Sequence, residues 1–233
     1  MNAKIHQHDF ADKLTLADAL ARDIAGKLDA AIKARGKASI AVSGGGTPKV
    51  MFAVLAEQEI DWSKVTITLV DERWVDEDNE RSNARMVRNT LIAHEAHVAA
   101  FLPLFDKAHA DDVDAALEGV GEKVDALGKP FDVVVLGMGP DGHTASFFPG
   151  GDHLAEALDL NGTRSVLSMR AGGAGEPRIT LSLPRVLDTR TLYLHIEGAD
   201  KKDVLARAQA GEDFPIAAVL KQDRVPVDVY WAA

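Results

Sequence analysis

A histidine in a glycine-rich turn is the first feature of this sequence that could carry out chemistry. His143 lies in GMGPDGHTAS, at the end of the apolar run FDVVVLGMG that spans residues 131–139. Its imidazole can take up or release a proton near neutral pH. Glycine, small and hydroxyl residues flank His143, a setting that distinguishes it from the other histidines of the chain. His143 is therefore our candidate for an acid–base group.

The segment SGGGTPKV, residues 43–50, has a composition that could bind an anion. Three consecutive glycines join a predicted strand to a predicted helix, and they leave the backbone N–H groups of that junction uncovered. N–H groups at a helix N-terminus attract anions. We expect Thr47 to be the N-cap of the helix and Pro48 its first residue. A tight steric turn also needs one or two glycines, so the segment alone leaves both interpretations open.

Charged residues near the ends of other segments could complete a site. Asp71 closes the apolar strand predicted at 65–72, so its carboxylate lies near the end of the sheet. Arg73 follows it and could hold an anion or a developing oxyanion. Arg178 ends the glycine-rich loop that begins at Arg170, and Lys201 comes soon after the segment HIEG. Each of these two basic residues could also be an ordinary solvated side chain.

Two nucleotide-binding motifs are only partly matched. GMGPDG, residues 137–142, has the three glycines of the dinucleotide fingerprint, but no second strand ending in an acidic residue follows about 20 positions later. SGGGTPKV lacks the glycine-lysine-hydroxyl ending of a P-loop. The sequence contains no cysteine, which excludes disulfides, thiolate metal sites and a cysteine nucleophile. We expect neither an organic cofactor nor a metal.

The elements that must position these residues alternate between helix and strand. Strands alternating with helices indicate an α/β fold of three layers, α/β/α, around a mostly parallel, Rossmann-like central sheet. In such open sheets ligands bind beyond the carboxyl ends of the strands, where SGGGTP, DERW and GMGPDGHTAS all fall. We expect Thr15 and Asp18 to form a capping box at the start of the first helix, and Ser82 to cap the third. The pattern predicts helices at 15–34, 48–58, 82–94, 111–127, 199–211 and 214–222, and strands at 38–43, 65–72, 131–139, 164–169, 190–198 and 225–232.

Length and charge set broader limits. The 233 residues suit a single α/β domain over 1–233, with a possible small subdomain or loop insertion around 150–180. The formal net charge of -10 argues against a nucleic-acid partner, although a few local cations suffice for a small anion. The N-terminus lacks the apolar core of a signal peptide, and no stretch approaches the ~18 apolar residues of a membrane span. We expect a cytoplasmic monomer or small homo-oligomer without a membrane partner.

These segments together resemble the 6-phosphogluconolactonases. The likeness runs along most of the chain, in order and spacing, through SGGGTP, VDERWV, SN at 82–83, LGMGPDGHTASFFPG and PRITLSLPRVLD. The wider superfamily includes the glucosamine-6-phosphate deaminases, which share the fold and a similar glycine loop. The resemblance implies hydrolysis of 6-phospho-D-glucono-1,5-lactone to 6-phosphogluconate in the oxidative pentose phosphate pathway, with no cofactor.

The resemblance also implies a role for each matching position. His143 would activate the water that attacks C1 of the lactone. The substrate's phosphate would bind to the glycine-rich loop, with Arg178 and Lys201 completing a clamp; Lys202 is the alternative to Lys201. The residues of that loop are Ser43, Gly44, Gly45, Gly46 and Thr47.

Two further residues of the predicted site carry hypotheses of our own. Arg73 is our hypothesis for the donor to the developing oxyanion, and nearby backbone amides are the alternative. Asp71 would orient either His143 or a substrate hydroxyl.

Two other functions compete with lactone hydrolysis. Deaminases carry a glutamate where this chain has Phe148, and an aromatic residue where it has Arg73, so both positions favour the lactonase. A non-catalytic sugar-phosphate sensor is the second alternative, because related folds serve as effector domains of transcription regulators. Such a regulator would need a DNA-binding segment, and an inactive relative would be expected to have lost His143 or a clamp residue.

Overall fold

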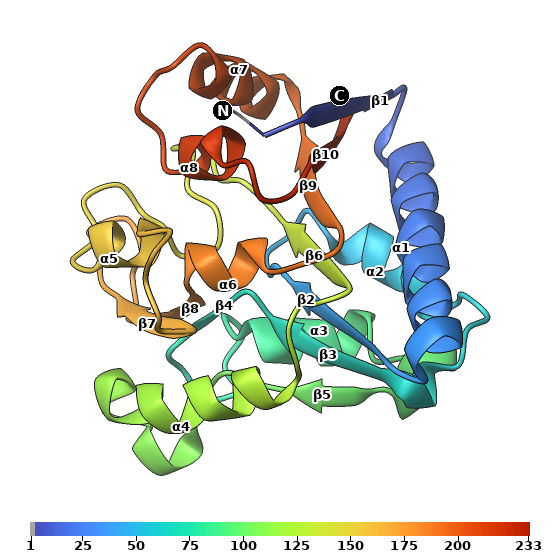
Figure 1. Cartoon of the computed structure of the whole chain (residues 1–233), viewed down its shortest axis with the longest axis horizontal. Helices are drawn as coiled ribbons and strands as arrows, with labels where there is room; N and C mark the ends of the chain where they lie inside the picture. The colour runs from blue at the N-terminus through green and yellow to red at the C-terminus, as the bar shows by residue number, and fades with distance from the viewer. Residues whose placement is uncertain (1–2) are drawn as a thin grey trace.

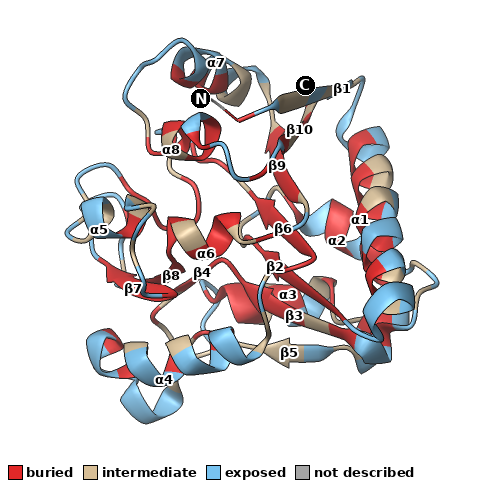
Figure 2. Ribbon diagram, viewed as in Figure 1, coloured by how far each residue is buried: buried red, intermediate tan, exposed pale blue. Residues whose placement is uncertain are grey.

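The computed structural model describes residues 3–233, and its centre is a seven-stranded sheet in which all neighbouring strands run parallel (Figure 1). β2 and β6, near the middle of the sheet, are buried along their whole length (Figure 2). Burial on both faces explains why these strands read as unbroken apolar runs. The strand order is β1 (Ile5–Phe10), β10 (Val227–Ala232), β9 (Leu192–Glu197), β6 (Val133–Leu136), β2 (Ala38–Val42), β3 (Val65–Leu69) and β5 (Ala100–Leu102).

Helices cover both faces of this sheet. α1 and α2 pack against each other on one side, and α6 and α8 lie on the other (Figure 1). This arrangement confirms the three-layer α/β/α prediction. Among residues 3–233, no helix has both the length and the apolar character that crossing a membrane requires. The helices are α1 (Lys13–Arg35), α2 (Lys49–Ala56), α3 (Asn83–Thr90), α4 (Val113–Ala126), α5 (Leu154–Leu158), α6 (Leu183–Leu187), α7 (Ala199–Gln209) and α8 (Ile216–Lys221), with 3₁₀ turns at Trp62–Lys64, His94–Val98 and Lys107–His109.

A second, antiparallel sheet of three strands divides one predicted strand in two. β4 (Asp71–Arg73) pairs with β8 (Arg178–Leu181), which pairs with β7 (Val166–Met169). Val70 is the point of transfer, because its N–H bonds to Val42 in the large sheet and its carbonyl accepts from Leu181 in the small one. The segment predicted as one strand at 65–72 therefore leaves the large sheet after Leu69, and the residues from Asp71 onward pair with β8.

The start of α1 differs from the prediction. This helix begins at Lys13, and Asp12 is its N-cap, with a carboxylate that accepts from Thr15 N at 2.8 Å. The capping box predicted at Thr15 and Asp18 is wrong by one turn, since the capping oxygen comes from the acidic residue three positions before Thr15.

The start of α2 also differs, and the difference bears on the site. The helix begins at Lys49, with Pro48 in the cap position and no side-chain capping bond. Thr47 is therefore not the N-cap that we predicted. Its hydroxyl is left to face a cavity, where it accepts a hydrogen bond from Lys201. The predicted cap at Ser82 is confirmed, because its side chain accepts from Arg85 N at the start of α3.

Three strands were not predicted from the sequence. β1, with the sequence IHQHDF, is an edge strand in which four of the six residues are exposed or partly exposed polar side chains, so it lacks the apolar run of a buried strand. β5 is only three residues long, and β8 follows the glycine-rich loop directly. α5, β7 and β8 fall in or near the region 150–180 where we expected a subdomain or insertion.

Candidate active site

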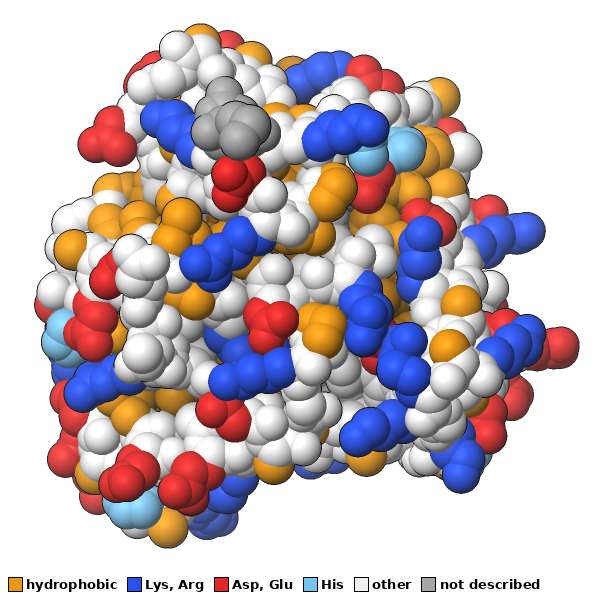
Figure 3. Space-filling model, in the orientation of Figure 1, with side chains coloured by type: hydrophobic (Ala, Val, Ile, Leu, Met, Phe, Trp, Pro, Cys, Tyr) orange, Lys and Arg blue, Asp and Glu red, His pale blue; other side chains and the backbone are white. Residues whose placement is uncertain are grey.

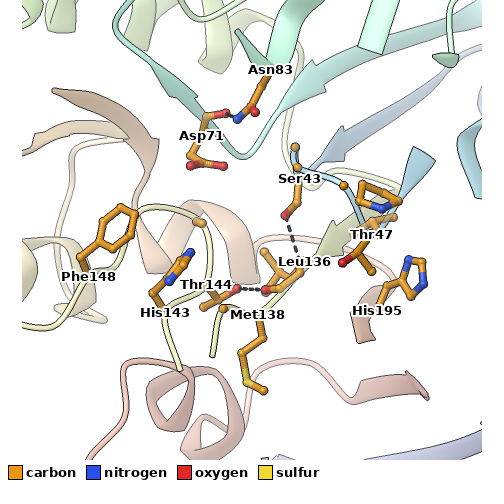
Figure 4. Close-up of a pocket in the computed structure, with 18 of the residues that line it drawn as sticks. Ser43, Thr47, Asp71, Asn83, Leu136, Met138, His143, Thr144, Phe148 and His195 are labelled. Atoms are coloured by element: carbon orange, nitrogen blue, oxygen red, sulfur yellow. Dashed lines mark hydrogen bonds between the residues drawn. The ribbon is translucent and has the colours of Figure 1, made fainter. Parts of the chain in front are cut away.

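One cavity of about 270 Å³ opens where the carboxyl ends of β2, β6 and β9 meet the small sheet (Figure 4). The loops that follow β2 and β6 supply most of its wall, as expected of an open parallel sheet, and His195 of β9 and Lys201 of α7 add to it. The structure brings every site residue predicted from the sequence to this one cavity. Those residues are Ser43, Gly44, Gly45, Gly46, Thr47, Asp71, Arg73, His143, Arg178 and Lys201.

The glycine-rich loop needs glycine for two separate reasons. Gly45 has a φ of 91°, a left-handed conformation that other residues rarely adopt. A Cβ added to Gly44 would lie 1.9 Å from Asn83 Oδ1, so the loop passes directly against that side chain. Ser43 joins the loop to the one after β6, because its Oγ accepts from Gly137 N at 3.0 Å. The loop is thus held from both sides, and its residues Ser43 to Thr47 line the cavity.

Two adjacent lysines on α7 have different surroundings. Lys201 is half-buried, lines the cavity and donates from Nζ to Thr47 Oγ1 at 3.3 Å. Its burial lowers the pKa of the ammonium group, and the nearby Glu197 carboxylate opposes that effect. Lys202 Nζ lies 2.8 Å from Asp9 Oδ2 and 3.5 Å from the Trp231 ring centroid. Only Lys201 is placed to meet an anion at the glycine-rich loop.

His143 is held by a carboxylate from its own turn. Its Nδ1 lies 2.5 Å from Asp141 Oδ1, which also accepts from the His143 backbone N–H. Partial burial opposes ionisation of Asp141, but the hydrogen bond from His143, the charge of His143 and backbone hydrogen bonds together outweigh it and lower the pKa of this carboxyl. On its other side the imidazole packs against Phe148, with ring centroids 4.4 Å apart. Nδ1 is thus committed to Asp141, and Nε2 is the nitrogen that can act on a substrate.

Asp71 does not hold His143, which corrects one of our two hypotheses for it. Its Oδ2 accepts from Ser146 Oγ at 2.6 Å and lies 4.0 Å from Arg178 Nη1. Figure 4 shows Asp71 beside Asn83, whose Nδ2 donates to the Asp71 carbonyl. The reason is the transfer of the chain to the small sheet, which places Asp71 against β8. The other hypothesis, that Asp71 orients a substrate hydroxyl, stays a prediction.

Two arginines from paired strands share the wall near Asp71. Arg73 and Arg178 are register partners in the β4–β8 pair. Arg178 is buried, and this burial lowers the pKa of its guanidinium group, although the negative charge of Asp71 opposes the effect. Its Cζ lies 5.3 Å from the Phe148 ring centroid. The Nε atoms of both guanidinium groups lack a hydrogen-bond partner within residues 3–233. Buried guanidinium nitrogens without a partner favour an anionic or oxygen-rich ligand.

Glu72 connects the small sheet to the start of α3. Its side chain is buried and accepts from the backbone N–H groups of Arg73, Asn83 and Ala84, and from Ser82 Oγ. This carboxyl therefore serves the free N–H groups at the N-terminus of α3 and places Asn83 against the glycine-rich loop. Burial raises its pKa to about 7, in spite of the three backbone hydrogen bonds that oppose the rise.

We expect Glu72 to make the protein less stable as the pH rises from about 4.5 to 7. The pKa of Glu72 is higher in the folded than in the unfolded chain, so the folded state binds more protons in this window. The stabilisation that Glu72 contributes is complete at pH values below its pKa in the unfolded chain, and it is lost as the pH rises through its pKa in the folded chain. The free energy of unfolding changes by about 3 kcal/mol at most over this window. Urea unfolding of wild type and Glu72→Gln at several pH values isolates it. If the free-energy difference between them stays constant across the window, Glu72 does not titrate there.

Several residues of the cavity wall were not predicted. Asp141 carried a signal that we passed over, because an aspartate two residues before a histidine in a tight turn can bond to it locally. His195 is a polar residue between Leu194 and Ile196 of β9, which is a weaker signal. Within residues 3–233 no group of three His, Asp or Glu side chains could hold a metal ion. The unpredicted lining side chains include Asn83, Met138, Thr144, Phe148 and His195.

Fold and site together define an α/β protein with a small-molecule cavity that is lined by a glycine-rich loop and a histidine held by an aspartate. The chain belongs to the family of glucosamine-6-phosphate isomerases and 6-phosphogluconolactonases, whose model matches residues 11–231. This membership confirms the resemblance seen in the sequence.

The relatives cover almost the whole chain. A 6-phosphogluconolactonase of Rhizobium meliloti (strain 1021) is 51% identical over 97% of this chain and 98% of its own. One from Mesorhizobium japonicum is 47% identical over 99% and 96%. The crystal structure of a 6-phosphogluconolactonase from Shewanella baltica OS155 superposes with a TM-score of 0.93 at 41% identity, over 99% and 98%.

Proposed function

We propose that this chain hydrolyses 6-phospho-D-glucono-1,5-lactone to 6-phosphogluconate, as a step of the oxidative pentose phosphate pathway. The observation that carries the proposal is that a histidine–aspartate pair and a glycine-rich loop with its lysine line the same cavity. The pair supplies a base for the lactone end of the substrate, and the loop supplies donors for the phosphate end. The curated names of relatives at 38–51% identity support the same reaction.

The proposed mechanism begins with water. His143 Nε2 removes a proton from a water molecule as its oxygen attacks the C1 carbonyl, and Asp141 stabilises the imidazolium that results. The carbonyl π electrons move to oxygen, where Arg73 is our candidate donor. When the carbonyl reforms, the bond between C1 and the ring oxygen breaks. The imidazolium returns its proton to that oxygen, which leaves the open-chain acid and the neutral histidine.

Binding of the phosphate group positions the substrate in the site. Backbone N–H groups of the loop from Gly44 to Thr47 bind the phosphate oxygens, and Lys201 adds a positive charge beside Thr47. Arg178 completes the clamp from β8. Holding the lactone at a fixed place relative to His143 makes the attack effectively unimolecular. Because the lactone also hydrolyses unaided in water, positioning can account for much of the acceleration that is needed.

The position of Phe148 argues against the deaminase alternative. It occupies the place of the deaminase glutamate and packs on the His143 ring. An apolar ring cannot carry a proton or a charge, so the site lacks the acid–base group that ring opening and deamination of an amino sugar would use there. A structure of a monomeric glucosamine-6-phosphate deaminase shares the fold at a TM-score of 0.77 and 19% identity. At that identity the likeness concerns the fold alone.

The setting of the reaction is part of the same proposal. We propose a single α/β domain that works in the cytoplasm as a monomer or small homo-oligomer, without a nucleic-acid or membrane partner. On the face shown in Figure 3, basic side chains are interspersed with acidic ones rather than gathered into one basic surface. Together with the net charge of -10, this distribution supports a small-molecule substrate over a polyanion.

The test is a coupled assay. Glucose-6-phosphate dehydrogenase generates the lactone in the cuvette, and 6-phosphogluconate dehydrogenase follows the product. Hydrolysis well above the spontaneous rate supports the proposal, and a rate equal to that of buffer overturns it. Ammonia release from glucosamine 6-phosphate is measured in parallel, since a positive result there would favour the deaminase.

A further inference from the structure

Gly139, the second glycine of GMGPDG, lies directly against the imidazole of His143. Both residues line the cavity. A Cβ added to Gly139 would lie 2.2 Å from His143 Cε1 and 2.3 Å from its Nδ1, so the ring occupies the space that a side chain would need. The φ of Gly139 is not in the left-handed region, so its backbone conformation does not require glycine. The absence of a side chain at this position therefore serves the histidine.

Phe148 makes the second contact with the imidazole. The two ring centroids lie 4.4 Å apart and the ring planes are inclined by 32°. Figure 4 shows the two side chains next to each other in the cavity wall. Phe148 is only 4% exposed, and the guanidinium of Arg178 lies near its ring. Since Phe148 is itself packed into the wall, it offers His143 a fixed apolar surface.

The hydrogen bond to Asp141 does not by itself fix the orientation of the ring. It holds Nδ1 only, and the carboxylate that accepts it is on a side chain that is 44% exposed. The ring plane could still swing about this one bonded atom. Contacts with Gly139 and with Phe148 restrict that movement. The turn that carries these groups is itself closed by a hydrogen bond from Gly139 N to the His143 carbonyl at 2.9 Å.

We propose that Gly139 and Phe148 are positioning residues for His143: the bare Cα of the glycine and the ring of the phenylalanine confine the imidazole, so that Nε2 stays in place to activate water. This inference rests on the proposed function, in which His143 is the base.

Gly139→Ala tests the first contact. The atoms nearest to the added methyl group belong to the side chains of His143 and Asp141, both partly exposed, so the imidazole can swing toward solvent without disturbing the fold. We expect kcat to fall about 10²-fold, the effect of misplacing a reacting group by about 1 Å. The Tm, the KM for the lactone and the affinity for 6-phosphogluconate should stay near those of wild type.

Two controls show whether the methyl group acts through the histidine. Gly119→Ala adds the same group on α4, where nothing lies within 4 Å of the new Cβ, and should leave kcat unchanged. Gly139→Ala combined with His143→Ala should be no slower than His143→Ala alone, because the imidazole that the methyl group displaces is already gone. Two independent effects would instead multiply.

Phe148→Leu tests the second contact, and Phe147→Leu is its matched control. Phe147 is fully buried and is not among the residues that line the cavity. Both substitutions should lower the Tm, because each removes part of a packed ring. Only Phe148→Leu should lower kcat, by about tenfold at unchanged KM. It should also shift the NMR signal of His143 Cε1–H, which the neighbouring ring current moves in wild type; His143→Ala identifies that signal.

The outcomes separate this inference from the proposed function. A loss of kcat in Gly139→Ala and Phe148→Leu, with KM unchanged and no further loss in the double variant, supports the inference. A wild-type enzyme that hydrolyses the lactone, with kcat unchanged in both variants, overturns the inference alone. So does a loss of kcat matched by an equal loss of product affinity, which indicates general damage to the site. If wild type is no faster than buffer, the proposed function fails and the inference fails with it.

Discussion

Replacement of His143 by alanine is expected to lower kcat for lactone hydrolysis by ~10²–10⁴-fold, the usual contribution of a general base. The affinity for 6-phosphogluconate should stay near that of wild type, because the proposed phosphate contacts lie on the glycine-rich loop and α7. Stability should change little, since the imidazole is partly exposed and bonds to an exposed aspartate. The measurement is the coupled assay at saturating lactone, with the spontaneous rate subtracted, and calorimetry with the product.

The control for this prediction is another histidine. His97→Ala removes an exposed imidazole from a 3₁₀ turn and should leave kcat unchanged. Asp141→Asn should give an intermediate loss, because an amide can still bond to Nδ1 but does not stabilise the imidazolium by charge. A kcat near the wild-type value in His143→Ala would mean that another group activates the water. Equal losses of kcat and of product affinity would instead indicate a collapsed site.

The parts of the fold that could be predicted are those in which local sequence and tertiary environment agree. β2 and β6 are apolar because both of their faces are buried, so composition alone reveals them. The loops after these strands contain the glycine-rich segment and His143. Since parallel strands end at the same edge of a sheet, the shared cavity follows from the element order. The order of the elements was therefore enough to predict that these two segments meet.

The parts that could not be predicted depend on contacts between distant segments. The apolar run before Asp71 continues smoothly through Val70, and only the pairing with β8 turns the chain into a second sheet there. That turn places Asp71 beside Ser146, whereas His143 bonds to Asp141 of its own turn, so the hypothesis that Asp71 orients His143 failed for this reason. The position of His195 behind the loop likewise depends on the register of β9 against its neighbours. A single sequence contains no signal for that register.

Replacement of Lys201 by alanine is expected to raise KM for the lactone by about 10- to 100-fold, the range for losing a hydrogen bond to a charged group. Its kcat should change much less, because in the proposed function Lys201 binds the phosphate end of the substrate, which does not react. The sequence left Lys201 and Lys202 as alternatives, and the structure separates them. Lys201 lines the cavity beside Thr47, whereas Lys202 pairs with Asp9 on β1.

Lys202→Ala is therefore the matched control, with the same chemical change one residue along the same helix. We expect its KM to stay within about twofold of wild type, since exposed ion pairs contribute little. Steady-state kinetics of the two variants, with inorganic phosphate as a competitive inhibitor, measure the difference directly. Lys201→Ala should weaken inhibition by phosphate to the same degree as it weakens binding of the lactone. Equal effects of the two substitutions would show that net charge on α7, and not a placed ammonium group, attracts the substrate.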